Sequence, residues 1–292
     1  MCENEENKEQ SKNGIKTINN QINDNFKENE SYIIATINIK KEDINKNIRI
    51  INSFEEVNKD FYFGKEEDRH KYENEKEIKK CKIKINDKII PFSYYYQFLE
   101  EGNFIIKYKF TEDIKNINYM FYDCSYFINI DFTNFNAKNI TNMSYMFCYC
   151  NLLKYINLSN LNTQNVTDMS RMFTGCESLT TIDLSHNFNT QNVTNMSYMF
   201  SRCFSLVNLD LTNFNTQNVT DMNFMFSRCR SLIKIDLSSF NTKNVTRMVR
   251  MFSGCNSLIN LDISHFNTQN VTEVHSVFDR CYSLIKKCLI KI

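Results

Sequence analysis

The sequence is poor in the residues and motifs on which catalytic sites are usually built. It contains five glycines, one proline and no tryptophan among 292 residues, and its four histidines are scattered. Glycine-rich phosphate-binding loops, the nucleophile motif G-x-S-x-G and the zinc motif H-E-x-x-H are all missing. We therefore expect a protein that is not an enzyme and that has no cofactor and no metal site.

An excess of charge of one sign and long apolar runs are missing as well. The 35 Lys and Arg residues balance 34 Asp and Glu residues, so we do not expect a nucleic-acid partner. No run approaches the roughly 18 apolar residues that span a bilayer. The first residues, MCENEENKEQ, do not resemble a secretory signal. We expect a cytoplasmic chain without a membrane span, with the cell surface as the alternative if the chain is incomplete.

Three regions of different composition follow one another along the chain. Residues 1–30 are rich in Asn, Glu and Lys, which predicts a disordered leader. Residues 31–112 contain short, partly alternating runs of Ile, Tyr and Phe, which predict a small β-rich domain that caps the next region. Residues 113–292 are dominated by one repeating unit, of which we count about seven copies.

Six of the repeating units are marked by Asn-Val-Thr or Asn-Ile-Thr, and Asp113 occupies the same place in a degenerate first copy. Successive marker residues are 26 residues apart, except for one interval of 27 between Asn165 and Asn192. The markers are Asn139, Asn165, Asn192, Asn218, Asn244 and Asn270. A fixed period of 20–29 residues with Leu-x-x-Leu-x-Leu spacing is typical of leucine-rich repeats.

Two periodicities alternate within a unit. Val166, Met169, Met172, Phe173 and Cys176 lie at positions 0, 3, 6, 7 and 10, which predicts one face of a short helix. The Asn before this face suits a helix N-cap. A period of two follows, with Leu, Ile and Leu pointing inward from a short strand. We therefore predict an α/β fold, a curved leucine-rich-repeat solenoid with one parallel strand and one helix per repeat.

The shared motif N-V-T-x-M-x-x-M-F-x-x-C-x-S-L-x-x-I-D-L-S-x-F-N-T covers Asp113 to Ile292. It resembles the BspA-like leucine-rich-repeat family, in the 26-residue form found in mycoplasma-type surface proteins and in protists. The resemblance implies the repeat fold just described. It also implies a cell-surface role in adhesion or host contact.

Cysteine recurs once in every unit. The column comprises Cys124, Cys150, Cys176, Cys203, Cys229, Cys255 and Cys281. A disulfide ladder or a metal row is one interpretation, but neighbouring units place these residues too far apart to bridge and supply no accompanying ligands. We expect small buried core residues. The Asn-x-Thr markers also match glycosylation sites, and we assign them to capping instead.

Two surfaces of the predicted stack remain as binding candidates. Outward positions on the helical side carry arginines and aromatic residues, a composition typical of interfaces. As candidate partner-binding residues we select Arg202, Phe224, Arg228, Arg230, Arg247 and Arg250. A secondary candidate is an acidic column on the concave strand face, Asp183, Asp210, Asp236 and Asp262. The plainer alternative for each surface is a solvated face.

The expected function is therefore a non-catalytic protein–protein interaction scaffold that uses a surface built from repeats. The protein partner and the oligomeric state do not follow from the sequence. A cell-surface adhesin of the BspA-like type that binds host matrix or glycan is the alternative.

Overall fold

A computed structural model describes residues 31–59, 73–86, 88–110, 114–135, 138–185 and 187–285. The expected leader, residues 1–30, lies outside this part. A seven-stranded mixed sheet organises the N-terminal half, with strand order β4-β3-β6-β1-β7-β8-β9. Its N-terminal strands are β1 (Tyr32–Ile39), β3 (Lys82–Ile85), β4 (Lys88–Ile90) and β6 (Gly102–Lys109), and its strands from the repeat region are β7 (Phe127–Asp131), β8 (Tyr155–Asn157) and β9 (Thr181–Asp183).

The N-terminal segment and the repeats share this one sheet. β1 pairs antiparallel with β6 on one side and with β7 on the other. A separate ribbon joins β2 (Asn47–Arg49) to β5 (Tyr95–Gln97). The short helices η1 (Lys41–Asp43), α2 (Phe54–Asn58) and α3 (Glu75–Ile78) complete the segment. Its isoleucine-rich strands bury residues such as Ile33 and Ile37 in a core that continues into the repeats.

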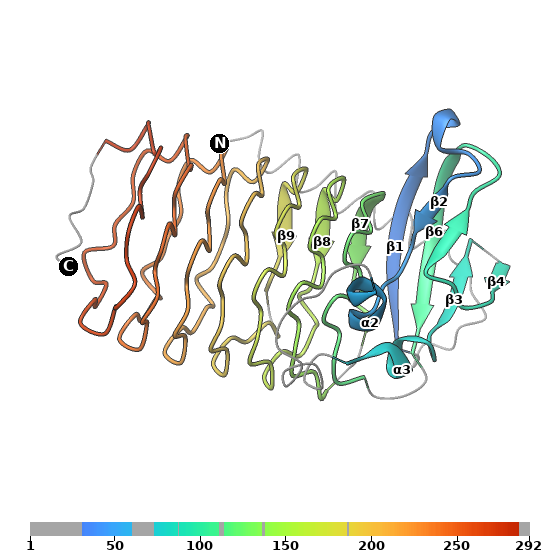
Figure 1. The fold of residues 1–292 in the computed structure, drawn as a ribbon, viewed down its shortest axis with the longest axis horizontal. Coiled ribbons are helices and arrows are strands. Elements are labelled where there is room, and N and C mark those ends of the chain that lie inside the picture. Colours follow the sequence, from blue (N-terminus) through green and yellow to red (C-terminus); the bar gives the residue numbers. More distant parts are fainter. Residues whose placement is uncertain are drawn as a thin grey trace.

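The repeats form coils that stack side by side from β7 to the C-terminal end (Figure 1). β7, β8 and β9 pair in parallel, and equivalent residues such as Ile130, Ile156 and Ile182 lie opposite one another. In the later described coils, one isolated parallel bridge, between Lys234 and Asn260, lies at the position of the strand. The predicted strand is therefore present in three coils and is mostly lost beyond them. The other isolated bridges, from Asn116 to Glu273, form a separate column before the turn segments.

The predicted helix in each repeat is wrong. Helical residues in the described part of the chain are confined to η1, α2 and α3, all before the repeats. The segment from Met143 to Cys150 instead forms tight turns, in which Met146, Cys148 and Cys150 donate backbone N–H groups to Met143, Tyr145 and Phe147, at 3.4, 3.1 and 3.1 Å. The fold is a β-sheet with stacked turn-rich coils, and it is not an α/β solenoid.

Alternate N–H groups of each turn segment join it to the next coil. Met143, Tyr145, Phe147 and Tyr149 donate to carbonyls 25 positions on, those of Asp168, Ser170, Met172 and Thr174, at 2.8–3.0 Å. A helix satisfies its backbone groups internally. Here the same groups bond between coils, so a coil depends on its neighbours for its hydrogen bonds as well as for burial.

The interior consists of columns of identical side chains. Seven phenylalanine rings, from Phe121 to Phe278, stack with centroids 5.4–5.9 Å apart. The cysteine column is buried beside them, as the sequence predicts, and its described members are free thiols. The buried positions were thus identified correctly even though the backbone that carries them was not.

The marker asparagines do not cap helices, since the coils contain none. From Asn165 on, each donates its side-chain amide to a carbonyl of the preceding coil, for example Asn165 to Lys138 at 3.2 Å and Asn192 to Gln164 at 2.7 Å. The same contact recurs at Asn218, Asn244 and Asn270. The threonines of these five markers repeat the pattern, as in the bond from Thr194 to Thr167 at 3.2 Å.

Candidate functional site

The turn segments of successive coils form one long face, called here the turn face. Its third turn position has positive φ and carries Tyr119, Tyr145, Arg171, Tyr198, Phe224 and Arg250. Positive φ is unusual for bulky residues. These side chains stack on one another: Tyr198 and Phe224 lie 4.5 Å apart, and the Arg171 guanidinium lies 3.9 Å from the Tyr198 ring. Phe224 and Arg250 are therefore members of a stacked column that belongs to the fold.

Arg202, Arg228 and Arg230 lie beside this column. Arg202 pairs with Glu177 at 3.5 Å, and Arg230 lies 4.4 Å from the Phe204 ring. The stem of Arg228 lies along Gly254 of the next coil. Arg228 and Arg230 are exposed, so their charged groups face solvent while their stems follow the coils.

Arg247 stands apart from the other five predicted partner-binding residues. It lies in the column of isolated bridges, between Asp221 and Glu273. Its guanidinium pairs with both carboxylates, at 3.3 and 3.1 Å. These ion pairs link three successive coils. Asp221 is half-buried, whereas Glu273 is exposed, and an exposed pair of this kind contributes little stability. The structure thus brings five of the six residues to the turn face and places Arg247 in a neighbouring charged column.

The acidic column lies on the strand face, and its carboxylates stabilise turns of the backbone. One oxygen of Asp183, Asp210, Asp236 and Asp262 accepts the backbone N–H two residues later, at 2.9–3.1 Å. Side chains of Asx residues favour such turns. The N–H and hydroxyl of Ser238 lower the pKa of Asp236, which keeps that carboxylate charged. These aspartates have a folding role in addition to presenting a row of negative charge.

A hollow of about 230 Å³ opens on the strand face after β9. Tyr155, Thr181 and Asp183 line one side, and Asp210 and Phe214 of the following coil line the other. β9 is the last strand of the seven-stranded sheet. The lining residues from Thr181 to Ser185 fall within the single 27-residue interval of the repeat, and the others belong to the coils on either side. The hollow therefore adjoins the coil in which the repeat period changes.

The cysteines do not form a metal row in the described coils. Each thiol from Cys150 to Cys281 donates to the carbonyl of a phenylalanine in the preceding coil, at 3.0–3.3 Å. Burial raises the pKa of the Cys176 thiol well above its ordinary value, so the group stays protonated and unreactive. Within the described residues, no group of three or more His, Cys, Asp or Glu side chains is arranged to hold a metal ion.

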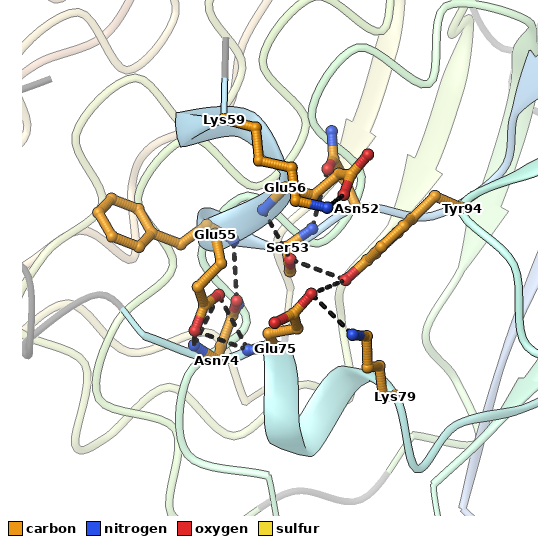
Figure 2. Close-up of polar contacts among 10 residues, drawn as sticks. Asn52, Ser53, Glu55, Glu56, Lys59, Asn74, Glu75, Lys79 and Tyr94 are labelled. Carbon is orange, nitrogen blue, oxygen red and sulfur yellow. Dashed lines mark hydrogen bonds and ion pairs between the residues drawn. The ribbon is translucent and has the colours of Figure 1, made fainter. Parts of the chain in front are cut away.

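Polar side chains that sequence analysis did not single out converge at the start of the stack. Figure 2 shows Glu55, Asn74 and Glu75 gathered between the short helices α2 and α3. Glu55 accepts the backbone N–H groups of Asn74 and Glu75 at 3.0–3.3 Å. Glu75 also accepts from Tyr94 at 2.9 Å and pairs with Lys79 at 3.0 Å. The hydrogen bond from Lys79, and to a smaller extent that from Tyr94, lowers the pKa of Glu75 below its ordinary value.

This cluster covers the edge of the first coil that would otherwise be exposed because no coil precedes it. In later coils, carbonyls of the turn segment accept from the coil before, but the first coil has no predecessor. Asn52 fills two of these positions, donating its backbone N–H to Met120 and its side-chain amide to Tyr122, at 2.7 and 2.9 Å. The Asn74 amide donates to Asn118 at 2.6 Å and to Asn116 at 3.5 Å. The buried amides Asn52 and Asn74 thus substitute for a missing coil.

Together, the in-register bridges, the stacked side-chain columns and the capped first edge define a repeat protein made of turn-rich coils. Residues 95–201 and 181–289 match the family model described as "Mycoplasma protein of unknown function, DUF285". The two matches overlap and together cover about two thirds of the chain. The chain therefore belongs to this family. No curated protein and no solved structure matches it.

Two further observations concern partners and membranes. The comparisons name no partner, substrate or activity for the family. Among the helices of the described residues, none has the length and apolar character that crossing a bilayer requires.

Proposed function

We propose that the chain is a non-catalytic scaffold that binds a protein partner through its turn face. The observation that carries this proposal is the exposed pair Arg228 and Arg230 beside Phe204 and the stacked column. Arginine and aromatic side chains dominate the binding energy of many interfaces. The column fixes the backbone beneath the pair, so little conformational freedom is lost on binding.

The structure refines the choice of residues for a test. Phe224 and Arg250 belong to the stacked column, so their substitution perturbs folding and binding together. Arg228 and Arg230 project to solvent and can be reversed in charge with less effect on the coils. We therefore propose R228E/R230E as the binding variant. The double variant K138E/K243E is a matched control, because both lysines are exposed and the change in net charge is the same.

The test is affinity capture from cells of the source organism with the full chain as bait, followed by identification of bound proteins. Proteins captured by wild type and by K138E/K243E, but lost with R228E/R230E, support the proposal. Equal capture by all three baits contradicts the turn face as the binding surface. If substitution of the acidic column abolishes capture instead, the strand face is the binding surface.

A second candidate function is adhesion at a cell surface. It is supported by the resemblance of the 26-residue unit to BspA-like repeats, a finer assignment than the family match gives. Under this proposal, the same faces bind host matrix proteins or glycans. Binding of the purified chain to immobilised matrix proteins or to a glycan array tests it, and absence of binding in both assays contradicts it.

A further inference from the structure

A row of exposed aliphatic side chains runs along the C-terminal half of the stack. It consists of Val207, Ile233, Ile259 and Ile285, whose exposed fractions are 36, 43, 38 and 79%. Each occupies the position directly after a buried leucine in its coil, at the corner between the turn face and the strand face. We call these four residues the aliphatic stripe.

The stripe is continuous because its members are bonded to one another. Ile233 donates its N–H to Val207, Ile259 donates to Ile233, and Ile285 donates to Ile259, at 3.1–3.2 Å. The equivalent residues of the earlier coils are Ile128, Lys154 and Thr180, so the apolar row begins only after the register change. Exposed apolar residues that occur singly need no explanation, whereas a continuous row is typical of an interaction site.

Charged and aromatic residues border the stripe on opposite sides. Three positions further along the coils lies the acidic column, represented here by Asp210, Asp236 and Asp262. Three positions before the stripe lie Phe204, Arg230, Asn256 and Tyr282, of which Tyr282 is 78% exposed. The exposed residues Asn208, Lys234 and Asn260 lie between the stripe and the acidic column. A ligand on the stripe therefore meets a polar row and then negative charge along one flank, and a mixture of aromatic and polar side chains along the other.

The distance between neighbouring members of the stripe favours a helical ligand over an extended one. Neighbouring coils joined by parallel hydrogen bonds are about 4.8 Å apart. A helix lying along the stack axis presents one apolar residue per turn, every 5.4 Å. Alternate side chains of an extended strand recur at about 6.6 Å and fall out of step with the coils. The three steps between coils from Val207 to Ile285 span about 14 Å, which is the length of roughly ten residues of helix.

We propose that the aliphatic stripe binds an amphipathic α-helix of a partner protein, with apolar residues at a spacing of three and four and with Lys or Arg on the flank that faces the acidic column. The longest helix in the described residues, α2, has five residues, so the described part of a second copy does not provide this ligand. The single-residue width of the stripe also suits one helix better than the roughly 800 Å² per partner of a standard protein interface. Of the residues named for the turn face, the flank of the stripe includes Phe204 and Arg230 but not Arg228, so the single variant R228E separates this proposal from the turn-face proposal.

The probe for the test is a displayed library of 16-residue helical peptides with randomised surface positions, selected on the full chain. The stripe variant is V207T/I233T/I259T, which keeps β-branched residues and removes apolar surface. The control is Q191T/Q217T/K243T, one exposed position in each of three coils away from the stripe. Thermal unfolding of both variants establishes that they fold.

We expect the selected peptides to share apolar residues at a spacing of three and four with basic residues on one flank. The stripe variant is expected to weaken their binding more than tenfold, whereas the control variant and the single variant R228E bind as wild type does. Acidic or proline-rich peptides, an empty selection, or undiminished binding to the stripe variant would overturn the proposal. Stripe-dependent binding to phosphatidylcholine vesicles without helical peptide selection would identify a membrane surface instead and overturn it as well.

Discussion

The thiol of Cys176 donates a hydrogen bond to the carbonyl of Phe147, 3.1 Å away in the preceding coil. The same carbonyl accepts the backbone N–H of Cys150 at 3.1 Å, within its own coil. A carbonyl oxygen has two lone pairs, and both are used in this fully buried position. This arrangement explains why the column carries cysteine and not alanine or valine.

Replacing Cys176 with alanine should lower the free energy of unfolding by about 2 kcal/mol, because it leaves a cavity and removes a buried hydrogen bond. Cys148→Ala is the matched control, since Cys148 is also buried but stands outside the column. We expect its cost to be smaller by about 1 kcal/mol. Urea unfolding measures both values, and equal losses would contradict the role of the thiol as a donor.

The capping cluster predicts that Asn74→Ala destabilises the first coil. The change leaves the carbonyl of Asn118 without its donor at 2.6 Å and the N–H of Phe54 without its acceptor at 2.9 Å. We expect a loss of about 2 kcal/mol in the free energy of unfolding and faster hydrogen exchange at Tyr119 and Phe121. Asn160→Ala removes an exposed amide that donates to Thr133 and should cost less than about 1 kcal/mol. Equal effects would mean that the cluster does not cap the stack.

Gly175 lies at a turn position with positive φ, where one other coil has Gly254 and the remaining described coils carry larger residues such as Tyr149 and Arg202. A Cβ atom at this position would lie 2.7 Å from the Tyr149 ring. We expect Gly175→Ala to cost about 2 kcal/mol through this contact and the left-handed conformation. Gly254→Ala meets only the flexible stem of Arg228 at 3.2 Å and should cost less. A double-mutant cycle with Tyr149→Ala should recover part of the loss, and no recovery would contradict the steric cause.

Burial raises the pKa of Asp168, whose oxygen accepts the N–H of Ser170 at 2.8 Å. The folded chain therefore holds this proton more tightly than the unfolded chain does, and the free energy of unfolding falls as the pH rises from about 4 through the raised pKa. An asparagine at position 168 keeps the side-chain oxygen that accepts the N–H of Ser170 but carries no charge. Asp168→Asn should therefore stabilise the fold at pH 7 by on the order of 1 kcal/mol.

The equivalent residue of the next coil provides the reverse experiment. Asn195 accepts from Ser197 at 3.0 Å, in the same arrangement as Asp168 and Ser170. Asn195→Asp should destabilise the fold at pH 7 and have little effect below pH 4. The free energy of unfolding of wild type and both variants is measured by chemical unfolding at several pH values. The same pH dependence in all three proteins would contradict a raised pKa at this position.

The sequence predicts the repeat period and the buried positions of each coil, but not its backbone. Three overlapping four-residue turns place Met143, Met146, Phe147 and Cys150 inward, and a helix gives the same spacing of three and four. The usual signal for turns of this type is glycine at the position of positive φ. Tyr145 and Tyr149 stand there instead, so the turns were not recognisable from composition.

The candidate site was identified only in part, for the same reason. Phe224 and Arg250 point outward on the predicted helix, and they also occupy the outward third position of a turn in the structure. The sequence therefore predicts the face that carries arginine and aromatic residues. That these side chains stack on one another depends on the short distance between coils, which the helix prediction did not contain. Asn52 and Asn74 lie outside any repeat and gave no periodic signal.

The central claim is that coils with parallel hydrogen bonds, and not helices, set the spacing of the turn face. Double electron–electron resonance between non-cysteine spin labels at Glu177 and Tyr282, equivalent residues four coils apart, measures this spacing directly. Four steps at about 4.8 Å predict a backbone separation of about 19 Å. A separation of about 32–40 Å, the value for packed helices, would contradict the account.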